Sequence, residues 1–269
     1  MGETLTVGIG GFGAVGLKVA AALDRGVPGL ELKAVSARDH AKARANMAGF
    51  ARPVPVVGLG DLADCDIVVE GLPAAVFDEI ARPAIERGRI FVPTSVGQLL
   101  PRPDLIARAE ETGARIVAPT GALLGLDAVR AAAEGVIHSV VMTTRKPPGG
   151  LAGAPYLVEN GISVEGLTEA KRVFSGSARD GAKGFPANVN VAAALALAGI
   201  GPDRTRLDIW ADPGVDRNCH RIEVKSDSCD FTLEIANVPS EENPRTGKVT
   251  ALSVLACLKG LAGTLKVGT

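Results

Sequence analysis

A glycine-rich run, VGIGGFGAVG at residues 7–16, constrains the fold of this chain more than any other segment. Apolar residues alternate where it begins and recur at helical spacing behind its glycines, which predicts a strand, a tight turn and a helix. Gly8, Gly10 and Gly13 match the pattern GxGxxG. In that pattern the first glycine makes the turn, the second lets the backbone approach a pyrophosphate, and the third lets helix and strand pack closely. The run predicts a dinucleotide site with the cofactor-binding residues Gly8, Gly10, Gly11, Phe12 and Gly13.

A purely conformational turn is the alternative interpretation, because the chain has 33 glycines. The surrounding sequence favours the cofactor site. Strand-like runs alternate with helical stretches over residues 1–119, which predicts a Rossmann-type domain with a parallel sheet. These runs are apolar throughout, as is typical of strands covered by helices on both faces. The predicted strands are Leu30–Val35, Asp66–Val69, Ile90–Val92 and Arg115–Ala118, and the predicted helices lie around Ala41 and at Ala74–Arg87 and Pro103–Glu111.

From residue 136 the strands become longer and alternate between apolar and polar residues. This pattern predicts an α+β catalytic and dimerisation domain over residues 120–240, with a mainly antiparallel sheet whose free face would suit a substrate cleft or a subunit interface. Residues 241–269 are expected to form a C-terminal helix that could pack back on the first domain. The predicted strands are Val136–Thr144, Arg206–Ala211, His220–Val224 and Asp230–Val238, and an alanine-rich helix is predicted at Val189–Ala198.

Composition excludes several classes of function. Lys and Arg number 29 against 30 Asp and Glu, and aromatic residues make up 3% of the chain, so nucleic acid is not an expected partner. No apolar run reaches the length of a membrane span and no leader pattern is present, so we expect a cytoplasmic protein that binds no membrane. The four cysteines form no CxxC pair and lack a histidine at zinc-ligand spacing, which predicts reduced, mostly buried thiols and no metal site.

The end of the second strand, AVSARD at residues 34–39, bears on the choice between NAD and NADP. Arg38 could bind a 2′-phosphate, whereas Asp39 stands one residue late for the acidic residue that usually binds the ribose hydroxyls of NAD. Alternatively, Asp39 caps the following helix while Arg38 is solvated. The turns at residues 70–73 and 94–97 follow strands and would line the same ligand-binding edge, or are ordinary turns.

Of the three histidines, only His220 has surroundings that suggest chemistry. Strand alternation places it on the face of Ile222 and Val224, so it is either a satisfied core histidine or a residue that lines a cleft. Asn188 and Asn190 stand two residues apart where the alanine-rich helix begins. One asparagine is enough for an N-cap, which leaves the other to contact a carboxamide or a substrate carbonyl.

Three segments together resemble the L-aspartate dehydrogenase family: NVNVAAALALAGIGPDRT at residues 188–205, RNCHRIEV at 217–224 and VPSEENPRTGKVTALSVLACL at 238–258. The glycine-rich run and APTGALLGLDAV at 118–129 extend the similarity over nearly the whole chain. The resemblance implies a Rossmann domain plus a catalytic α/β domain, usually as a homodimer. It also implies NAD or NADP as cofactor, His220 as the catalytic residue, and Ala122 and Asn188 in contact with the nicotinamide cofactor.

The implied reaction is reversible oxidation of L-aspartate to iminoaspartate or, after hydrolysis, oxaloacetate and ammonia. Hydride can leave Cα only once the amine is neutral, so a base is needed, and histidine titrates in the right range. We therefore expect His220 to be the base or acid. Arg145 and Lys146 are either ligands of the substrate carboxylates or solvated charges. Asn190 and Asn218 are further candidates for substrate contact.

Two other functions remain open at this stage. One is a related reductase of the aspartate-semialdehyde or dihydrodipicolinate type, although Cys219 should point away from His220 and is badly placed as its thiolate partner. The other is a catalytically silent nicotinamide-binding sensor, which would not need His220. The sequence also leaves open whether the product is released as iminoaspartate for nicotinamide biosynthesis or as oxaloacetate.

Overall fold

The computed structural model describes residues 4–186, 189–242 and 246–268. The chain divides into two compact units. The first unit comprises Met1–Gly121 with Thr250–Val267, and the second comprises Ala122–Val249 with Gly268–Thr269. Within the described residues, no helix combines the length and the apolar character that crossing a bilayer requires.

The first unit contains a parallel sheet with the strand order β2-β1-β3-β4-β5. Its strands are β1 (Leu5–Gly10), β2 (Leu30–Ser36), β3 (Ile67–Glu70), β4 (Ile90–Pro93) and β5 (Arg115–Ile116). Its helices are α1 (Ala14–Asp24), α2 (His40–Asn46), α3 (Phe77–Glu86), α4 (Pro103–Thr112) and most of α9 (Lys248–Ala262). The predicted Rossmann-type sheet is confirmed. Because β1 lies between β2 and β3, the strand order reverses there, and ligands bind at such a switch point in open α/β sheets.

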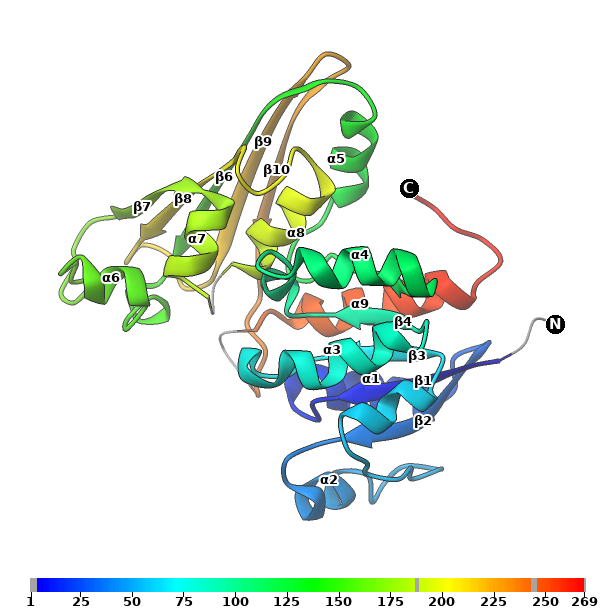
Figure 1. Ribbon diagram of the computed structural model, residues 1–269. Coiled ribbons are helices and arrows are strands. Elements are labelled where there is room, and N and C mark those ends of the chain that lie inside the picture. Colours follow the sequence, from blue (N-terminus) through cyan, green and yellow to red (C-terminus); the bar gives the residue numbers. More distant parts are fainter. Residues whose placement is uncertain (1–3, 187–188, 243–245, 269) are drawn as a thin grey trace. The chain divides into compact units, whose positions relative to one another are not determined.

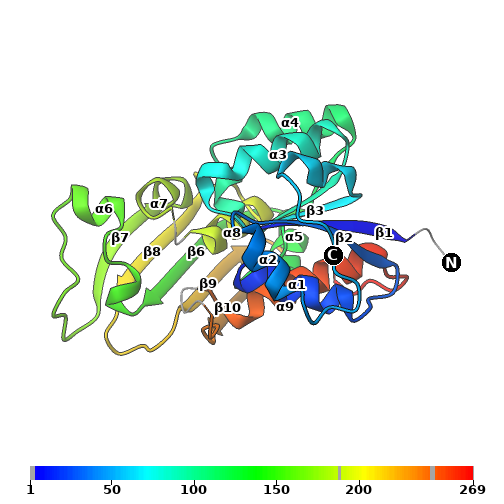
Figure 2. The same cartoon turned by 90° about the horizontal axis from the view of Figure 1, so that it is seen from below.

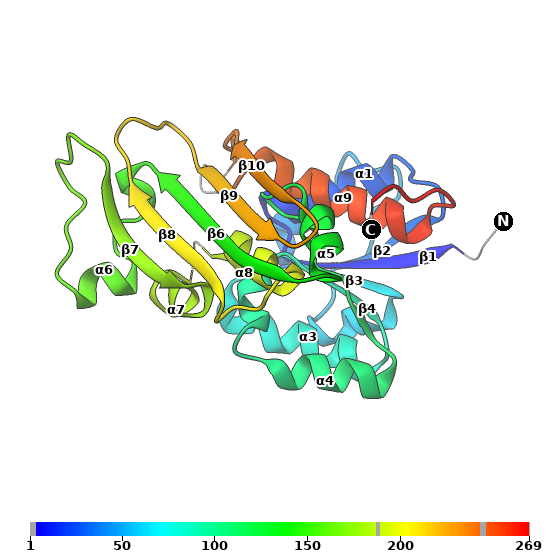
Figure 3. The same cartoon turned by 90° about the horizontal axis from the view of Figure 1, so that it is seen from above.

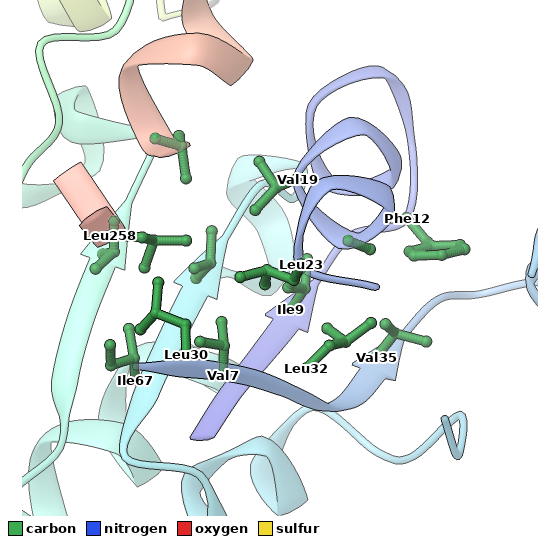
Figure 4. Packing of buried hydrophobic residues seen from close by; sticks show 14 of the residues in the cluster. Val7, Ile9, Phe12, Val19, Leu23, Leu30, Leu32, Val35, Ile67 and Leu258 are labelled. Carbon is green, nitrogen blue, oxygen red and sulfur yellow. The ribbon is translucent and has the colours of Figure 1, made fainter. Parts of the chain in front are cut away.

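Helices cover both faces of this first sheet. Figure 2 shows α3 and α4 on one face, with α1 and α9 on the other. Val7 and Ile9 of β1 are fully buried, and they pack with Val19 of α1 and Leu258 of α9 in one apolar cluster (Figure 4). This two-sided cover explains why the strands are apolar throughout, and it is the reason that α9 belongs to the first unit although it ends the chain.

The second unit contains a sheet with the order β10-β9-β6-β8-β7. The β6 and β8 strands are parallel and the other neighbours are antiparallel, which confirms the predicted mainly antiparallel sheet. The strands are β6 (Ile137–Lys146), β7 (Lys171–Ser177), β8 (Thr205–Ala211), β9 (Cys219–Ser226) and β10 (Asp230–Ala236). The helices are α5 (Leu126–Ala133), α6 (Pro155–Glu159), α7 (Ala178–Gly184) and α8 (Asn190–Ala198).

Four elements of the second unit, β7, α5, α6 and α7, have no clear signal in the sequence. The β7 strand, KRVFSGS, is an edge strand with a register shift between Arg172 and Phe174, so its apolar residues do not alternate. The helices α6 and α7 are only 5 and 7 residues long, which is too short for a clear helical period. Their existence depends on packing against the sheet rather than on a local signal.

The two faces of the second sheet differ in character. Buried residues alternate along its central strands, with Met142 and Thr144 of β6 and His220 and Ile222 of β9 on one face. We call this the helix face, because α7 and α8 lie against it (Figures 1 and 3). The opposite face, here called the open face, presents the intervening, more exposed residues of the same strands.

All four cysteines are free thiols, but they are not mostly buried as predicted. Cys65 is buried, whereas Cys219 and Cys257 are half-buried and Cys229 is exposed. The prediction was wrong for Cys229 because this residue lies in the tight connection between β9 and β10, where the chain turns at the surface.

Candidate active site

The structure changes the roles expected for the first glycines of the run. Gly8 and Gly10 lie within β1 rather than in the turn, so the roles assigned to them from the sequence are wrong. A Cβ atom at Gly8 would lie 3.0 Å from Sγ of the buried Cys65, and one at Gly10 would overlap the side chain of Ile80. These two glycines therefore allow close packing over β1 inside the first unit.

The turn itself uses a second GxGxxG frame that overlaps the first by one glycine, made of Gly11, Gly13 and Gly16. Gly11 follows β1 with a φ of 91°, and a Cβ there would overlap the carbonyl of Gly71. Gly16 lies in the first turn of α1, where a Cβ would overlap the carbonyl of Gly11. Among the described residues, no atom lies within 4 Å of a Cβ built on Gly13, the N-cap of α1. An open space at a helix N-terminus suits a phosphate.

Glu70 stabilises the turns around this site. Its side chain is fully buried at the end of β3, where it accepts hydrogen bonds from the backbone of Leu72 at 2.6 Å and from the backbone and hydroxyl of Ser95, each at 3.0 Å. Burial raises the pKa of Glu70. The backbone of Gly71 in turn donates to the carbonyl of Gly10 at 2.8 Å. The carboxyl group thus connects the turns after β3 and β4, and the backbone of Gly71 connects the first of these turns to the end of β1.

The Arg38 and Asp39 pair has a clear local structure. Asp39 is the N-cap of α2 and accepts a hydrogen bond from the backbone of Lys42 at 2.9 Å, so the capping interpretation is confirmed for Asp39. Arg38 is exposed just beyond the end of β2. The Asp39 side chain thus serves the helix, and Arg38 is the exposed charged group at the end of β2.

In the second unit, His220 lies on the helix face of β9 directly opposite Thr144 of β6. The Oγ1 atom of Thr144 and the Nδ1 atom of His220 are 2.5 Å apart, and the two residues are 2% and 5% exposed. Burial, and secondarily the charge of Lys146, lower the pKa of His220 to about 3. The imidazole is therefore neutral at physiological pH.

Lys146 is not the solvated charge that was one of its two interpretations. It ends β6 on the helix face, two residues beyond Thr144, and is 6% exposed. Burial lowers its pKa to about 8, so it is still mostly protonated at pH 7. It shares the helix face of β6 with Thr144, which is paired with His220, and its charge contributes to the lowered pKa of His220. The helix face thus brings a neutral imidazole and a buried ammonium group together.

Arg145 points the other way and is engaged on the open face. It donates to the carboxylate of Asp212 at 2.8 Å and lies over the ring of Trp210 at 4.9 Å. A groove of about 650 Å³ runs along this face and includes Cys219 and Trp210. His220 also borders the groove, but strand alternation directs its side chain to the opposite face. The groove is therefore distinct from the surroundings of the imidazole.

The remaining candidates lie in different environments within the second unit. The carbonyl of Ala122 accepts a hydrogen bond of 3.0 Å from the side chain of the buried Asn237, whose backbone donates to the carbonyl of Asn218 at 2.9 Å. Asn190 is the first residue of α8, and Val189 rather than Asn190 holds the N-cap position. Asn188 lies outside the described residues.

Known proteins similar to this chain place it in one family. The family model "Aspartate dehydrogenase, C-terminal" matches residues 127–261, and "Homoserine dehydrogenase, NAD binding domain" matches residues 11–119. An L-aspartate dehydrogenase of Bradyrhizobium diazoefficiens is 54% identical over 266 residues, which cover 98% of this chain and 94% of that protein. The chain belongs to the L-aspartate dehydrogenase family.

Other L-aspartate dehydrogenases are also similar to this chain over nearly its full length. L-aspartate dehydrogenase 3 of Bordetella bronchiseptica is 51% identical over 269 residues, covering 99% of this chain and 98% of that protein. The crystal structure of aspartate dehydrogenase from Thermotoga maritima matches with a TM-score of 0.76 over 98% of this chain and 99% of that one, at 23% identity. That likeness confirms the fold of the two units.

Sequence reasoning missed three residues that the structure brings to the candidate sites: Thr144, Glu70 as a buried carboxyl, and Asn237. Thr144 reads as one of several threonines in a strand, and only the pairing of β6 with β9 sets it against His220. Glu70 belongs to the predicted turn at residues 70–73, and nothing in that pattern predicts a buried carboxyl. A charged residue that directly ends an apolar strand is the one signal that could have drawn attention to it.

Proposed function

We propose that this chain catalyses the reversible NAD(P)-dependent oxidation of L-aspartate to iminoaspartate, which water hydrolyses to oxaloacetate and ammonia. The observation that carries this proposal is a buried, neutral His220 beside a buried Lys146 in a chain of the L-aspartate dehydrogenase family. A base and a cation are what oxidation of an amino dicarboxylate requires. The semialdehyde-type alternative is disfavoured, because the thiol nearest in sequence, Cys219, belongs to the open face.

The first step is removal of a proton from the substrate ammonium group, since an ammonium carbon cannot release hydride. His220 can accept this proton because its imidazole is neutral. A pKa of about 3 makes it a weak base, and burial is the larger cause of this low value. A bound dicarboxylate would offset the smaller cause, the positive charge of Lys146, and so raise the pKa of His220. When bound, NAD(P)⁺ supplies the acceptor for the hydride that leaves Cα. Once the imidazolium has passed this proton to solvent, the neutral imidazole can activate water against the imine.

Lys146 is the proposed partner of a substrate carboxylate. Its ammonium group lies on the helix face with His220, is protonated at pH 7, and is held on a strand rather than on a loop. A buried ammonium makes stronger hydrogen bonds to a carboxylate than a solvated one, because water does not compete.

Asn190 and Asn218 remain proposed substrate contacts, and Asn188 and Ala122 remain proposed cofactor contacts.

For the cofactor, we propose that Gly11, Phe12 and Gly13 bind the phosphates and that Arg38 binds a 2′-phosphate, which favours NADP. The open Cβ direction of Gly13 and the exposed position of Arg38 support this. Gly8 and Gly10 do not contact the phosphates in this proposal, because their backbone lies within β1. NAD can also bind as cofactor through the same phosphate site, since NAD and NADP differ only at the 2′-position of the ribose.

We also propose a cytoplasmic homodimer that pairs through the open face. The exposed thiol of Cys229 favours a reducing compartment. The open face carries the half-buried Trp210 together with arginine and carboxylate groups, so the surface can complement a second copy of itself about a two-fold axis. The charged residues are Arg145, Arg206, Arg221, Asp208, Glu223 and Glu234.

Light scattering tests the dimer. We expect Trp210→Glu to be monomeric, whereas Val158→Glu, which changes an exposed apolar residue of α6, stays dimeric. A dimeric Trp210→Glu protein would contradict this interface.

The activity is tested by NAD(P)H formation with L-aspartate and by NAD(P)H consumption with oxaloacetate and ammonia. We expect turnover in both directions, a loss of at least a hundredfold in His220→Ala, and near-normal turnover in His138→Ala, which changes an exposed histidine of β6. Full turnover in His220→Ala would contradict its catalytic role. If the wild type binds the cofactor but turns over no aspartate in either direction, the sensor interpretation is correct.

A further inference from the structure

The hydrogen bond between Thr144 and His220 determines which ring nitrogen can act as a base. A neutral imidazole has one N–H and one lone pair, and which nitrogen holds each is set by its partners. Thr144 is the partner of Nδ1, and among the described residues it is the one hydrogen-bond partner of the ring. The nitrogen left for a substrate is therefore Nε2.

We propose that Thr144 is a positioning residue whose hydroxyl oxygen accepts a hydrogen bond from Nδ1–H of His220, so that the lone pair for the substrate ammonium group is on Nε2. This inference rests on the proposed catalytic role of His220. Thr144 touches neither substrate nor cofactor in this proposal. It acts by holding one tautomer and one orientation of the imidazole.

The geometry makes this contact rigid. Thr144 and His220 are 76 positions apart in the chain but are directly paired in the β6–β9 ladder, with both side chains on the helix face. Directly opposed residues bring their Cβ atoms within about 5 Å of each other. Threonine is branched at Cβ, so its χ1 angle is restricted and its hydroxyl direction is well defined. Because both residues are buried, water competes little for the bond.

The direction of the hydrogen bond follows from the proton cycle. If the hydroxyl donated to Nδ1, the proton of the neutral ring would be on Nε2, and the accessible nitrogen would have no lone pair. Taking up a proton would then require the bond to Thr144 to break. If the hydroxyl accepts from Nδ1–H, the same bond persists in the neutral imidazole and in the imidazolium, since Nδ1 is protonated in both. No ring or hydroxyl rotation is needed during turnover.

The test uses Thr144→Val, which keeps the branched shape but removes the hydroxyl, and Thr144→Ser, which keeps the hydroxyl. The direct measurement is the ¹⁵N NMR spectrum of histidine-labelled protein, in which the chain's three histidines allow assignment by His40→Gln and His138→Gln. We expect Nδ1 of His220 to be protonated in the wild type and in Thr144→Ser. In Thr144→Val we expect a mixture of tautomers.

Comparing kcat with KM and Kd distinguishes a residue that positions His220 from one that binds substrate or cofactor. In Thr144→Val, kcat with L-aspartate should fall about tenfold or more, as loss of one hydrogen bond to the base would cause, while KM for aspartate and Kd for the cofactor stay within about twofold. Thr144→Ser should recover most of kcat. Equal kcat losses in both variants would contradict the proposal, because the hydroxyl would then not be the group that matters.

The NMR result stands apart from the proposed function. A wild-type spectrum with the proton on Nε2 overturns the inference even if Thr144→Val does not fold. If His220→Ala retains full turnover, the catalytic role of His220 fails, and the inference fails with it even where the tautomer is as expected. If His220→Ala is inactive while Thr144→Val keeps both the tautomer and kcat, the proposed function survives and the role of Thr144 does not.

Discussion

Single alanine substitutions at the glycines of residues 7–16 distinguish which of the two GxGxxG frames binds the cofactor phosphates. In Gly8→Ala, the new methyl group would lie 3.0 Å from Sγ of Cys65 and 3.2 Å from the carbonyl and a side-chain carbon of Leu62. Both neighbours are buried and cannot move freely. Such overpacking costs about 1–3 kcal/mol of the free energy of unfolding. At about 2–4 °C for each kcal/mol in a protein of this size, Tm should fall by roughly 2–12 °C. The Kd for NAD(P) should stay within about twofold.

Gly13→Ala should weaken cofactor binding while leaving the free energy of unfolding nearly unchanged. The backbone at Gly13 is extended, with φ −98° and ψ −152°, so alanine can adopt it, and no described atom obstructs the methyl group. Stability should change by less than about 1 kcal/mol, the size of an N-cap effect. The methyl group would occupy the space proposed for a phosphate. Losing one hydrogen bond to a charged group costs about 1.5–3 kcal/mol, which predicts a Kd roughly 10- to 150-fold higher.

Thermal unfolding without cofactor and isothermal titration with NAD⁺ and NADP⁺ measure the two effects separately. Gly49→Ala is a matched control, since a Cβ at this surface glycine has no described atom within 4 Å and its φ is not positive. The reasoning is refuted if Gly8→Ala weakens cofactor binding at unchanged Tm while Gly13→Ala binds normally. That outcome would return the phosphate site to the frame of Gly8, Gly10 and Gly13.

Three other predictions follow from the charges. First, the unfolded protein binds a proton at His220 below pH 6.5 while the folded protein does not until about pH 3, so stability falls as the pH drops through this range. The free energy of unfolding should fall by at most about 1.4 kcal/mol per pH unit for this one group. Chemical unfolding between pH 7 and pH 5 should therefore show a smaller fall in this free energy for His220→Gln than for the wild type. Equal slopes in the two proteins would contradict a buried neutral imidazole. Second, Arg38→Ala should raise the ratio of Kd for NADP⁺ to Kd for NAD⁺ about tenfold, because a charge-assisted hydrogen bond to the 2′-phosphate is lost. An unchanged ratio would show that Arg38 does not bind the 2′-phosphate. Third, Lys146→Met should raise KM for L-aspartate at least tenfold with cofactor Kd unchanged, whereas Lys171→Met, which changes an exposed lysine of β7, should leave both unchanged. A normal KM in Lys146→Met would show that this ammonium group does not bind the carboxylate.

Much of the architecture can be predicted because it depends on local patterns. The apolar β1 segment and the helical spacing behind it identify the Rossmann-type unit, and alternation in β9 places His220 with Ile222 on the buried face. The family resemblance rests on short segments that persist in order along the chain, so it needs no coordinates. The strand β7 was not predictable, because its bulge removes the alternation that would reveal it.

The functional glycines show where local pattern becomes ambiguous. The run of residues 7–16 contains GxGxxG twice, starting at Gly8 and at Gly11. Which glycine makes the turn depends on where β1 stops pairing with β2 and β3, and that pairing extends to Gly10. Residues more than 20 positions away therefore decide the frame, and the run itself does not contain this information.

By itself, the sequence determined the two-unit α/β fold, the family and the face on which His220 lies, because each depends on residues that are close together in the chain. Only the tertiary structure decided that the turn begins at Gly11, that Lys146 is buried, and that Thr144 lies within hydrogen-bond distance of His220. The physical reason is register. A strand's own alternation says which side chains share a face, but which residues stand opposite one another is set by hydrogen bonds between strands that are distant in sequence.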